Sequence, residues 1–409
     1  MDYQIHQLTN GIRVLHKPSS SNISHACILI NAGSRDEARD KMGLAHFIEH
    51  LMFKRTEKRT THQILNRLEL VGADLNAYTT KEYTCIHASF LGQHLERSLD
   101  LFEDILFHSV FPEEEMEKEK GVVLDEIASY QDLPEEAIQD DFEDIIFAGH
   151  PLGTNILGTA ETVSLFSRTD ILQFLNANYC TNEIVIGITG NDDFKKVKKI
   201  TEKVFGKLGS NTPARHRTPL NFYRPSMRDE SRQISQTHCV IGNRAYDTHH
   251  KLKVPLLLLN NLLGGTGMSS RLNLQLREKY GIAYTIESNY TPLTDTGIFS
   301  VYFGTDTEKA TRALNLIHRE FRKLREVRLG EIQLHQTKQK FNGQIALAEE
   351  NRLSLIISLA KSLLDYNRVD TLDEVMAKVN AVTADQLLEV ANEVLDPAQL
   401  TTLLFKAED

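Results

Sequence analysis

Two histidines four residues apart, His46 and His50, place the strongest constraint on how this chain can fold. Positions i and i+4 share one face of an α-helix, so a helix here would point both imidazoles toward the same ion. Glu49 lies just before the second histidine, close enough to touch whatever that ion binds. Apolar residues flank the motif and predict a helix packed into a core: Leu44, Phe47, Ile48, Leu51 and Met52.

Two histidines at helical spacing do not by themselves establish a metal site, because a catalytic zinc takes about three protein ligands plus water. A second helix, predicted over residues 113–131, offers carboxylates for the third position. Glu119 and Glu126 are two helical turns apart and therefore lie on one stripe, with Val122 and Val123 between them. A carboxylate on a packed stripe is costly unless it is paired or metal-bound. An amphipathic helix whose glutamates flank its core face is the alternative.

Together these residues resemble the pitrilysin/insulinase-type (M16) zinc peptidases. The resemblance rests on residues 43–54 and on the pattern Glu-x-x-Val-Val-x-x-Glu-Ile at residues 119–127. The order His-x-x-Glu-His inverts the commoner His-Glu-x-x-His zinc signature. The chain length is similar to that of the branch that includes mitochondrial processing peptidase and its bacterial relatives, with two homologous halves per chain. One departure is Arg55, where relatives usually have glycine, and it is not an expected ligand.

The resemblance covers nearly the whole chain and implies one catalytic zinc ion (Zn2+) per chain. It implies that His46, His50 and Glu126 are the metal ligands. It also implies that Glu49 is the general base and that Glu119 is a supporting carboxylate behind the ligands. A structural zinc site is the weaker interpretation, because structural sites usually fill all four positions with Cys or His.

Two further stretches gain roles through the resemblance. Asn76, Ala77 and Thr79 look like the family's edge-strand segment, where a peptide substrate pairs as an added strand. An ordinary turn that enters a strand is the alternative. Arg277 and Tyr284 resemble a second-half motif in which both residues help to hold the substrate. In the mechanism expected here, Arg277 would hold the bound peptide and Tyr284, with zinc, would stabilise the oxyanion. Without the resemblance, Arg277 at a helix C-terminus would only be a favourable neighbour of the helix dipole.

Periodicity and turn residues predict the elements of the first half of the chain. Strands are expected at 4–7, 12–16, 25–31, 83–90 and 184–189. Helices are expected at 60–72, 95–107, 113–131, 135–147 and 194–205. Residues 206–231 contain two Gly, several Ser and Pro and few apolar residues, which is typical of a linker between domains, here placed at 209–231.

The second half of the chain repeats features of the first half. Tyr280-Gly281 ends a helix as Val71-Gly72 does, and Tyr302-Phe303-Gly304 corresponds to Phe90-Leu91-Gly92. This internal duplication predicts an α+β fold with two homologous halves, each an antiparallel sheet with helices packed on it. The expected divisions are an N-terminal catalytic zinc-binding half at 1–208, the linker at 209–231, and a C-terminal half without the metal motif at 232–409.

Length and charge limit the classes of function. The chain has 409 residues, which suits two or three domains with ample core. Its net charge is 46 − 56 = −10, which argues against a nucleic-acid binder and is compatible with an acidic interior that attracts basic peptides. The sequence contains no Gly-x-Ser-x-Gly motif of a serine hydrolase. The glycine-rich stretch at 263–270 lacks the Gly-Lys-Ser/Thr ending of a P-loop and is better interpreted as a flexible or substrate-facing loop.

Targeting signals and cysteine usage favour the cytoplasm. Residues 1–6 show neither the basic segment nor the apolar run of a secretory signal. The longest apolar cluster, 254–263, is far short of the ~20 residues that span a membrane. The four cysteines form no Cys-x-x-Cys pair, which fits a reducing compartment: Cys27, Cys85, Cys180 and Cys239. We therefore expect a cytoplasmic protein without membrane or nucleic-acid partners.

The function that these features favour is a zinc-dependent endopeptidase that hydrolyses peptide bonds in unstructured peptides or extended segments. Zinc would activate a water molecule and Glu49 would accept its proton. The alternative is a non-catalytic peptide-binding or scaffold subunit, although such partners usually lose part of the metal triad. Larger members of the family carry four such halves in one chain, so this chain is expected to form a homodimer, or a heterodimer with a related chain.

Overall fold

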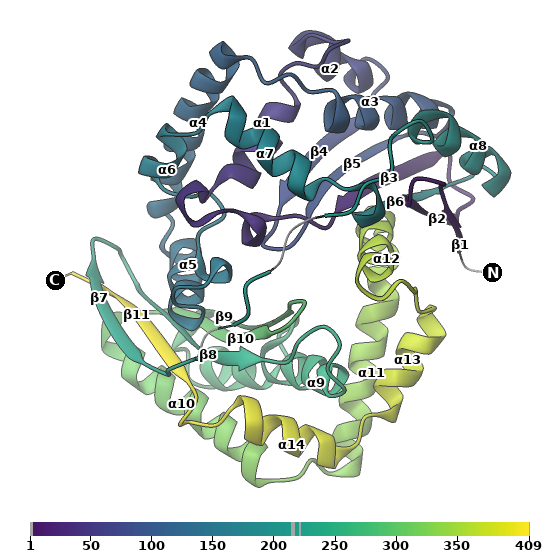
Figure 1. Ribbon diagram of the computed structural model, residues 1–409. Helices are drawn as coiled ribbons and strands as arrows, with labels where there is room; N and C mark the ends of the chain where they lie inside the picture. Colours follow the sequence, from purple (N-terminus) through teal and green to yellow (C-terminus); the bar gives the residue numbers. More distant parts are fainter. Residues whose placement is uncertain (1–2, 214–216, 221, 409) are drawn as a thin grey trace. The chain divides into compact units, whose positions relative to one another are not determined.

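The computed structural model describes residues 3–213, 217–220 and 222–408, which form two compact units (Figure 1). Unit 1 comprises the described residues of Met1–Ala128, Thr154–Thr218 and Leu347–Thr371. Unit 2 comprises those of Ser129–Gly153, Pro219–Ala346 and Leu372–Asp409. Each unit is built on its own β-sheet, with helices packed against that sheet.

Unit 1 contains a six-stranded sheet with the strand order β1-β2-β6-β3-β5-β4. The strands are β1 (Gln4–Gln7), β2 (Arg13–Pro18), β3 (Ile23–Ile30), β4 (Asp74–Thr79), β5 (Thr84–Leu91) and β6 (Ile184–Gly190). Strands β2 and β6 run parallel, and the other neighbouring strands are antiparallel. Strand β6 is buried along its whole length, which explains its nearly continuous apolar sequence. Strand β4 forms an edge of the sheet.

Helices cover both faces of this sheet. They are α1 (Leu44–Met52), α2 (Thr61–Glu69), α3 (Leu95–Phe107), α4 (Glu113–Gln131, up to Ala128), α6 (Ala160–Ser164), α7 (Arg168–Asn178), α8 (Phe194–Phe205) and α12 (Arg352–Tyr366). Short 3₁₀ helices are η1 (Ser34–Asp36), η2 (Arg39–Lys41), η3 (Gly92–His94) and η5 (Thr181–Glu183). Helices α1, α3 and α8 contribute to the main core on one face, whereas α12 packs on the other face.

Unit 2 contains a five-stranded sheet with the order β7-β11-β8-β10-β9. The strands are β7 (Met227–Arg232), β8 (Thr237–Ala245), β9 (Ala283–Pro292), β10 (Gly297–Thr305) and β11 (Thr401–Ala407). The helices are α5 (Pro134–Ile146), η4 (Pro151–Gly153), α9 (Lys253–Gly264), the π-helix η6 (Asn273–Lys279), α10 (Thr307–Glu326), α11 (Glu331–Ala348), α13 (Leu372–Ala381) and α14 (Ala384–Val394). Strand β9 forms an edge of this sheet, as β4 does in unit 1.

The two sheets share one topology. Without β1, the order β2-β6-β3-β5-β4 matches β7-β11-β8-β10-β9 strand for strand. The parallel pair falls at the same place in both sheets, β2 with β6 and β7 with β11. The predicted α+β class with two similar halves is therefore confirmed. Each sheet adds a parallel pair to the expected antiparallel pattern, since β6 and β11 return to their sheets after long helical connections.

Corresponding helices are exchanged between the two halves of the sequence. Helix α5 belongs to the first half of the chain, yet it packs on β8 and β11 of unit 2. Helix α12 belongs to the second half, yet it packs on β3 and β6 of unit 1. Its residues Ile356 and Ala360 lie against Gly187 of β6, where an added Cβ would be 3.0 Å from Ile356 Cγ1 and 3.1 Å from Ala360 Cβ. The glycine thus permits close packing of the exchanged helix.

This exchange makes the compact units differ from the contiguous halves 1–208 and 232–409. Part of the expected linker 209–231 is also regular structure, because Met227–Arg232 forms β7 and pairs with β11. The strand was not foreseen because its sequence, Met-Arg-Asp-Glu-Ser-Arg, is charged and lacks an apolar alternation. Linker residues 214–216 and 221 lie outside the described residues. Across the described ranges, no helix has both the length and the apolar character needed to cross a bilayer.

Candidate metal centre

Helix α1 carries the two histidines into the core of unit 1. Its apolar residues, including Phe47, Ile48 and Leu51, are buried in the main hydrophobic cluster. The histidines lie one turn apart on the same face, and their ring centroids are 4.5 Å apart. His46 is only 8 % exposed, so its position is set by the packing of the helix around it.

Helix α4 brings a carboxylate to these imidazoles. The Nε2 atoms of His46 and His50 are 3.2 Å apart. Glu126 Oε2 lies 3.8 Å from His46 Nε2 and 3.5 Å from His50 Nε2. One ligand atom from each of these three residues lies within 4.8 Å of the other two. The structure therefore brings together the three residues predicted to hold the metal.

The donor set fits a zinc ion. Tetrahedral bonds of about 2.0–2.2 Å separate neighbouring ligand atoms by roughly 3.3–3.6 Å, close to the separations of these three atoms. Among the described residues, the group consists of two histidines and one carboxylate, which is the number of protein ligands typical of a catalytic rather than a structural site. The Glu126 side chain is 42 % exposed, so solvent reaches the group from that side.

Glu119 orients one of the histidines, as predicted for a supporting carboxylate. The Nδ1–H of His50 donates to Glu119 Oε1 at 2.9 Å, which leaves Nε2 to face Glu126 and His46. Lys54 Nζ lies 2.5 Å from Glu119 Oε2, so this buried carboxylate is paired on both oxygens. A paired acceptor behind a metal-binding histidine sets its tautomer and ring orientation.

The protonation of His46 suits metal binding. Burial, with a smaller contribution from the neighbouring His50, lowers the pKa of His46 to about 4. The imidazole is therefore neutral at neutral pH, which is the form that coordinates metal ions.

Glu49 lies between the helix and the edge strand. The Thr79 hydroxyl at the end of β4 donates to Glu49 Oε2 at 2.7 Å. Burial raises the pKa of Glu49, the hydrogen bonds from Thr79 lower it, and the nearby Glu126 carboxylate raises it. A carboxyl group with a raised pKa is suited to accept and return a proton near neutral pH.

The predicted substrate strand, β4, is an edge strand that pairs with β5. Asn76 is exposed, and its Oδ1 accepts from the Ala77 backbone N–H at 2.8 Å. The Ala77 amide therefore points away from β5, toward the free edge. Of the three predicted residues, Thr79 lies next to the metal group through Glu49, and Asn76 and Ala77 lie further along the strand.

The two predicted second-half residues lie together in unit 2. Arg277 is in the last turn of η6, and its guanidinium carbon is 4.9 Å from the centroid of the Tyr284 ring. Tyr284 is at the start of β9 and is 80 % exposed. An exposed phenol of this kind is available to a ligand.

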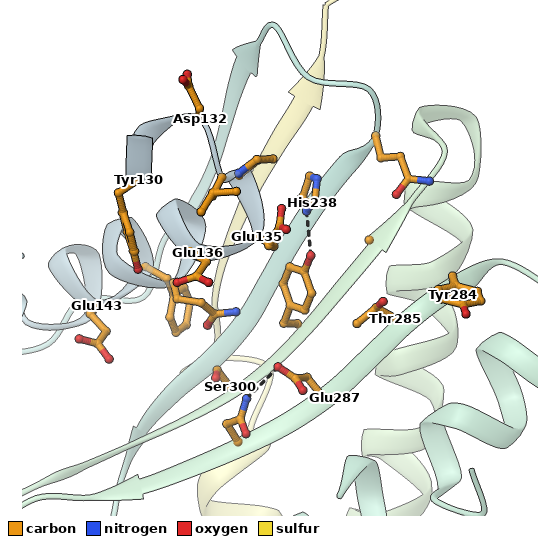
Figure 2. A pocket seen from close by; sticks show the side chains of 18 of the residues that line it. Tyr130, Asp132, Glu135, Glu136, Glu143, His238, Tyr284, Thr285, Glu287 and Ser300 are labelled. Atoms are coloured by element: carbon orange, nitrogen blue, oxygen red, sulfur yellow. Dashed lines mark hydrogen bonds between the residues drawn. The ribbon is translucent and has the colours of Figure 1, made fainter. Parts of the chain in front are cut away.

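Tyr284 also lines an acidic cavity of about 1010 Å³ within unit 2 (Figure 2). The cavity is bordered by the start of α5 and by strands β8, β9 and β10. On one side the His238 ring Nδ1 and the Tyr302 hydroxyl are 2.8 Å apart. Five carboxylates line the cavity, and the described lining residues include neither Lys nor Arg: Asp132, Glu135, Glu136, Glu143 and Glu287.

Some residues around these sites were not found from the sequence. Lys54 pairs with Glu119 from the turn that follows α1, where helical periodicity gives no signal. Glu37, which contacts the start of α1, gave no signal because it lies in a loop without periodicity. Glu135 and Glu136 lie in a predicted helix, and only the fold shows that they line a cavity with residues of β8 and β10.

Comparisons with known proteins agree with this fold and site. The family model Insulinase (Peptidase family M16) matches residues 13–160, and the model Peptidase M16 inactive domain matches residues 166–341. The chain is 30 % identical over 387 residues to the uncharacterized zinc protease YmxG of Bacillus subtilis, covering 94 % of each protein. The chain therefore belongs to peptidase family M16. The second family model falls on the half that lacks the His-x-x-Glu-His motif.

Other relatives and solved structures extend this agreement. The uncharacterized zinc protease ML0855 of Mycobacterium leprae is 31 % identical over 395 residues, which cover 95 % of this chain and 88 % of that protein. The crystal structure of a protease from Helicobacter pylori matches with a TM-score of 0.89 at 23 % identity, covering 99 % of both chains. A peptidase M16 inactive domain from Pseudomonas fluorescens matches with a TM-score of 0.91 at 19 % identity, covering 100 % of this chain and 98 % of that chain. These structures support the fold.

Replacing Thr79 with valine tests the contact between β4 and Glu49. The substitution removes the hydroxyl that donates to Glu49 and keeps the shape of the side chain. Because this hydrogen bond lowers the pKa of Glu49, we expect that pKa to rise in Thr79→Val, as measured by carbon-13 NMR titration of the metal-free protein. Ser89→Ala is the control, since Ser89 bonds to His25 elsewhere in the sheet. An unchanged pKa in Thr79→Val would show that the hydroxyl does not act on Glu49.

Proposed function

We propose that this chain is a zinc-dependent endopeptidase that cleaves extended peptides. One observation carries the proposal: two histidines and a glutamate converge beside the half-buried carboxylate of Glu49, which contacts the end of an edge strand. The names of the relatives in Bacillus and Mycobacterium, both zinc proteases, support the metal and the activity. The chain retains every residue of the site, which favours an enzyme over a non-catalytic peptide-binding subunit.

The chemistry follows from the roles of the side chains. His46, His50 and Glu126 would hold zinc, which when bound lowers the pKa of a water molecule to about 7 and polarises a carbonyl. Glu49 takes the proton of the attacking water at its carboxylate and later gives it to the leaving amine nitrogen. Thr79 holds the Glu49 carboxylate by a hydrogen bond, and Glu119 holds the His50 ring.

The edge strand suggests how a peptide would be held. A substrate added alongside β4 would accept a hydrogen bond from the outward Ala77 N–H in place of the Asn76 side chain. Main-chain pairing requires an extended segment, so folded proteins would be poor substrates. Because Thr79 of the same strand contacts Glu49, a paired peptide would be held beside the general base.

Substitutions in the motif separate metal binding from proton transfer. We expect Glu49→Gln to bind one zinc ion per chain and to lose about 10²- to 10⁴-fold in kcat, because its amide cannot accept the proton. We expect His46→Ala and His50→Ala to lose both zinc and activity. Metal analysis and cleavage of an unstructured peptide measure these outcomes.

The matched control is Asp125→Asn, which changes an exposed carboxylate next to Glu126. It should keep zinc and activity, whereas Glu126→Gln should lose zinc. Wild-type cleavage rates in Glu49→Gln would contradict the assigned base. Zinc binding without any cleavage by the wild-type protein would favour the non-catalytic subunit instead.

The acidic cavity of unit 2 supports a preference for peptides with Lys or Arg side chains. Its five carboxylates attract positive charge, and the described lining residues offer no basic side chain as a competitor. Main-chain pairing accepts many sequences, so charged pockets of this kind would provide the selectivity.

A double substitution, Glu135→Gln with Glu136→Gln, tests this preference. We expect KM to rise about two- to thirtyfold for a peptide with two lysines, and to stay unchanged for its glutamine analogue, since each of the two exposed ion pairs contributes about 0.2–1 kcal/mol. Glu114→Gln with Glu117→Gln is the control, because it removes the same charge from the exposed face of α4. Equal changes for both peptides, or for both variants, would contradict a role of the cavity in binding basic side chains.

We further infer that the working enzyme is a homodimer in the cytoplasm. The chain carries two homologous halves, whereas larger members of the family carry four, and a closed two-fold dimer is the commonest oligomer. The four cysteines are all buried free thiols, which fits a reducing compartment. In this arrangement Arg277 and Tyr284 would complete the site of the partner chain, with the tyrosine stabilising the oxyanion and the arginine holding the peptide.

Complementation tests whether these residues act in trans. Glu49→Gln damages the first half, and Tyr284→Phe damages the second half. Random exchange makes half of the dimers mixed, and each mixed dimer has one intact site, so about a quarter of wild-type activity should return in the mixture. Mass spectrometry confirms subunit exchange, and each variant alone is the control. Confirmed exchange without recovered activity would place the whole site within one chain.

A further inference from the structure

The helix that carries the metal ligands begins at a residue that has no side chain to cap it. Gly43 is the N-cap residue of α1 and has a left-handed φ of 93°. A Cβ at Gly43 would lie 2.5 Å from the Leu157 carbonyl oxygen and 2.8 Å from Gly158 Cα. Glycine is therefore required here by both its conformation and its packing. The usual capping residues, Ser, Thr, Asp and Asn, are excluded for the same reasons.

Glu37 supplies the missing cap from six residues upstream. Its Oε2 accepts from the Gly43 N–H at 2.9 Å, and its Oε1 accepts from the Ala45 N–H at 2.7 Å. Both carboxylate oxygens are thus used on amides that have no partner within the helix. Glu37 is 8 % exposed, so a buried acidic side chain caps the start of this helix.

The turn that Glu37 holds contains a predicted metal ligand. The helix starts at Leu44, so His46 is its third residue and lies in the first turn, directly after Ala45. His50 lies one turn further and is held instead by Glu119. Each histidine is therefore oriented by a different carboxylate, Glu119 through the ring and Glu37 through the backbone.

We propose that Glu37 is a positioning residue of the metal centre, which sets the first turn of α1 so that His46 faces His50 and Glu126. The inference rests on the proposed function, because it assigns zinc to those three residues. Glu37 makes no contact with the metal group itself and acts through the helix backbone.

The loop that carries Glu37 is fixed to the strand that carries the contact to Glu49. In η1 the Ser34 N–H donates to the Thr80 carbonyl at 3.1 Å, and the Arg35 N–H donates to the Lys81 carbonyl at 2.8 Å. Thr80 directly follows Thr79, whose hydroxyl donates to Glu49. The same loop therefore ties the start of α1 to the end of β4, and with it the metal ligands to the general base.

Charged neighbours hold this loop in place. The Arg217 Nε lies 3.0 Å from Asp36 Oδ1, next to Glu37 in sequence, and Arg35 Nη1 lies 2.6 Å from Glu82 Oε1. The pKa of Glu37 is raised to about 8, with burial as the largest cause, and the hydrogen bonds from the two amides and the nearby Lys81 act against this rise. The amide bonds thus stabilise a carboxylate that burial alone would disfavour.

The experiment compares Glu37→Gln with Asp104→Asn. Both replace a buried carboxylate of unit 1 with an amide of nearly the same shape, but Asp104 pairs with Thr56 and Arg59 and has no contact with the start of α1. In Glu37→Gln an NH2 group replaces one acceptor oxygen and faces an amide N–H. We expect zinc to bind about ten- to hundredfold more weakly to Glu37→Gln and within twofold of wild type to Asp104→Asn. Competition between each full-length protein and a chromogenic zinc chelator measures these affinities.

Two further readouts separate positioning from a general loss of stability. In the zinc-loaded enzyme, Glu37→Gln should lower kcat while KM for an extended peptide stays within about twofold, since the peptide-pairing strand is unchanged. In the metal-free wild-type protein, the Gly43 and Ala45 amides should be protected from hydrogen exchange, and this measurement needs no variant.

The outcomes are distinguishable. Rapid exchange of the Gly43 and Ala45 amides in the wild type would overturn the cap, whatever the variants show. Wild-type zinc affinity in Glu37→Gln, or an equal loss of zinc affinity in Asp104→Asn, would show that Glu37 has no specific role in positioning the metal ligands. Failure of the wild-type protein to bind zinc would instead overturn the proposed function and leave the capping geometry standing.

Discussion

Burial of helix α1 is the constraint on which the rest of unit 1 depends. Its apolar residues require a core on one side, and its three polar side chains then require partners at the same depth, because a buried polar group without a partner is destabilising. Each partner comes from a different element. Glu119 on α4 accepts from His50, Thr79 on β4 donates to Glu49, and the loop before α1 supplies the Glu37 carboxylate to its first amides. His50 and Glu49 thus have partners before any ion is added, whereas the buried Nδ1 of His46 has no hydrogen-bond partner among the described residues.

The two units share one fold, but only unit 1 has residues suited to bind a metal at the contact between corresponding helices. Both sheets have the same strand order, and α9 and α11 occupy in unit 2 the places that α1 and α4 occupy in unit 1. Where α1 and α4 meet through His50 and Glu119, α9 and α11 meet through Asn261, whose Nδ2 donates to Gln344 Oε1 at 2.7 Å. Two neutral amides are joined by this one hydrogen bond in the second copy, and they lack the charge and the nitrogen ligands that zinc prefers. The contact between helices is retained without the metal-binding chemistry.

Much of the local structure was predictable because it follows from the spacing of apolar residues over short stretches of the sequence. Helices at 95–107, 113–131 and 194–205 have the same bounds in the structure as in the prediction, since apolar spacing and flanking turn residues mark their ends. The same holds for the grouping of His46 with His50, because four residues make one helical turn. The choice of Glu126 required more, since nothing in residues 113–131 says which helix they contact. It came from a resemblance to a family, and the geometry brings the chosen residues together.

The sequence by itself determined most of the elements, the duplication and the grouping of His46 with His50, because each depends on spacing along the chain. Only the tertiary structure decided which elements meet. Helix α5, from the first half of the sequence, packs on the sheet of unit 2, and α12, from the second half, packs on the sheet of unit 1. The apolar spacing within each helix does not say which sheet it covers. Strand β7 forms from a charged segment because β11 offers it a partner. Glu37 became the cap of α1 because the packing of Gly43 against Gly158 leaves no room for a side chain there. Such pairings depend on contacts between distant residues, for which a single sequence carries no local signal.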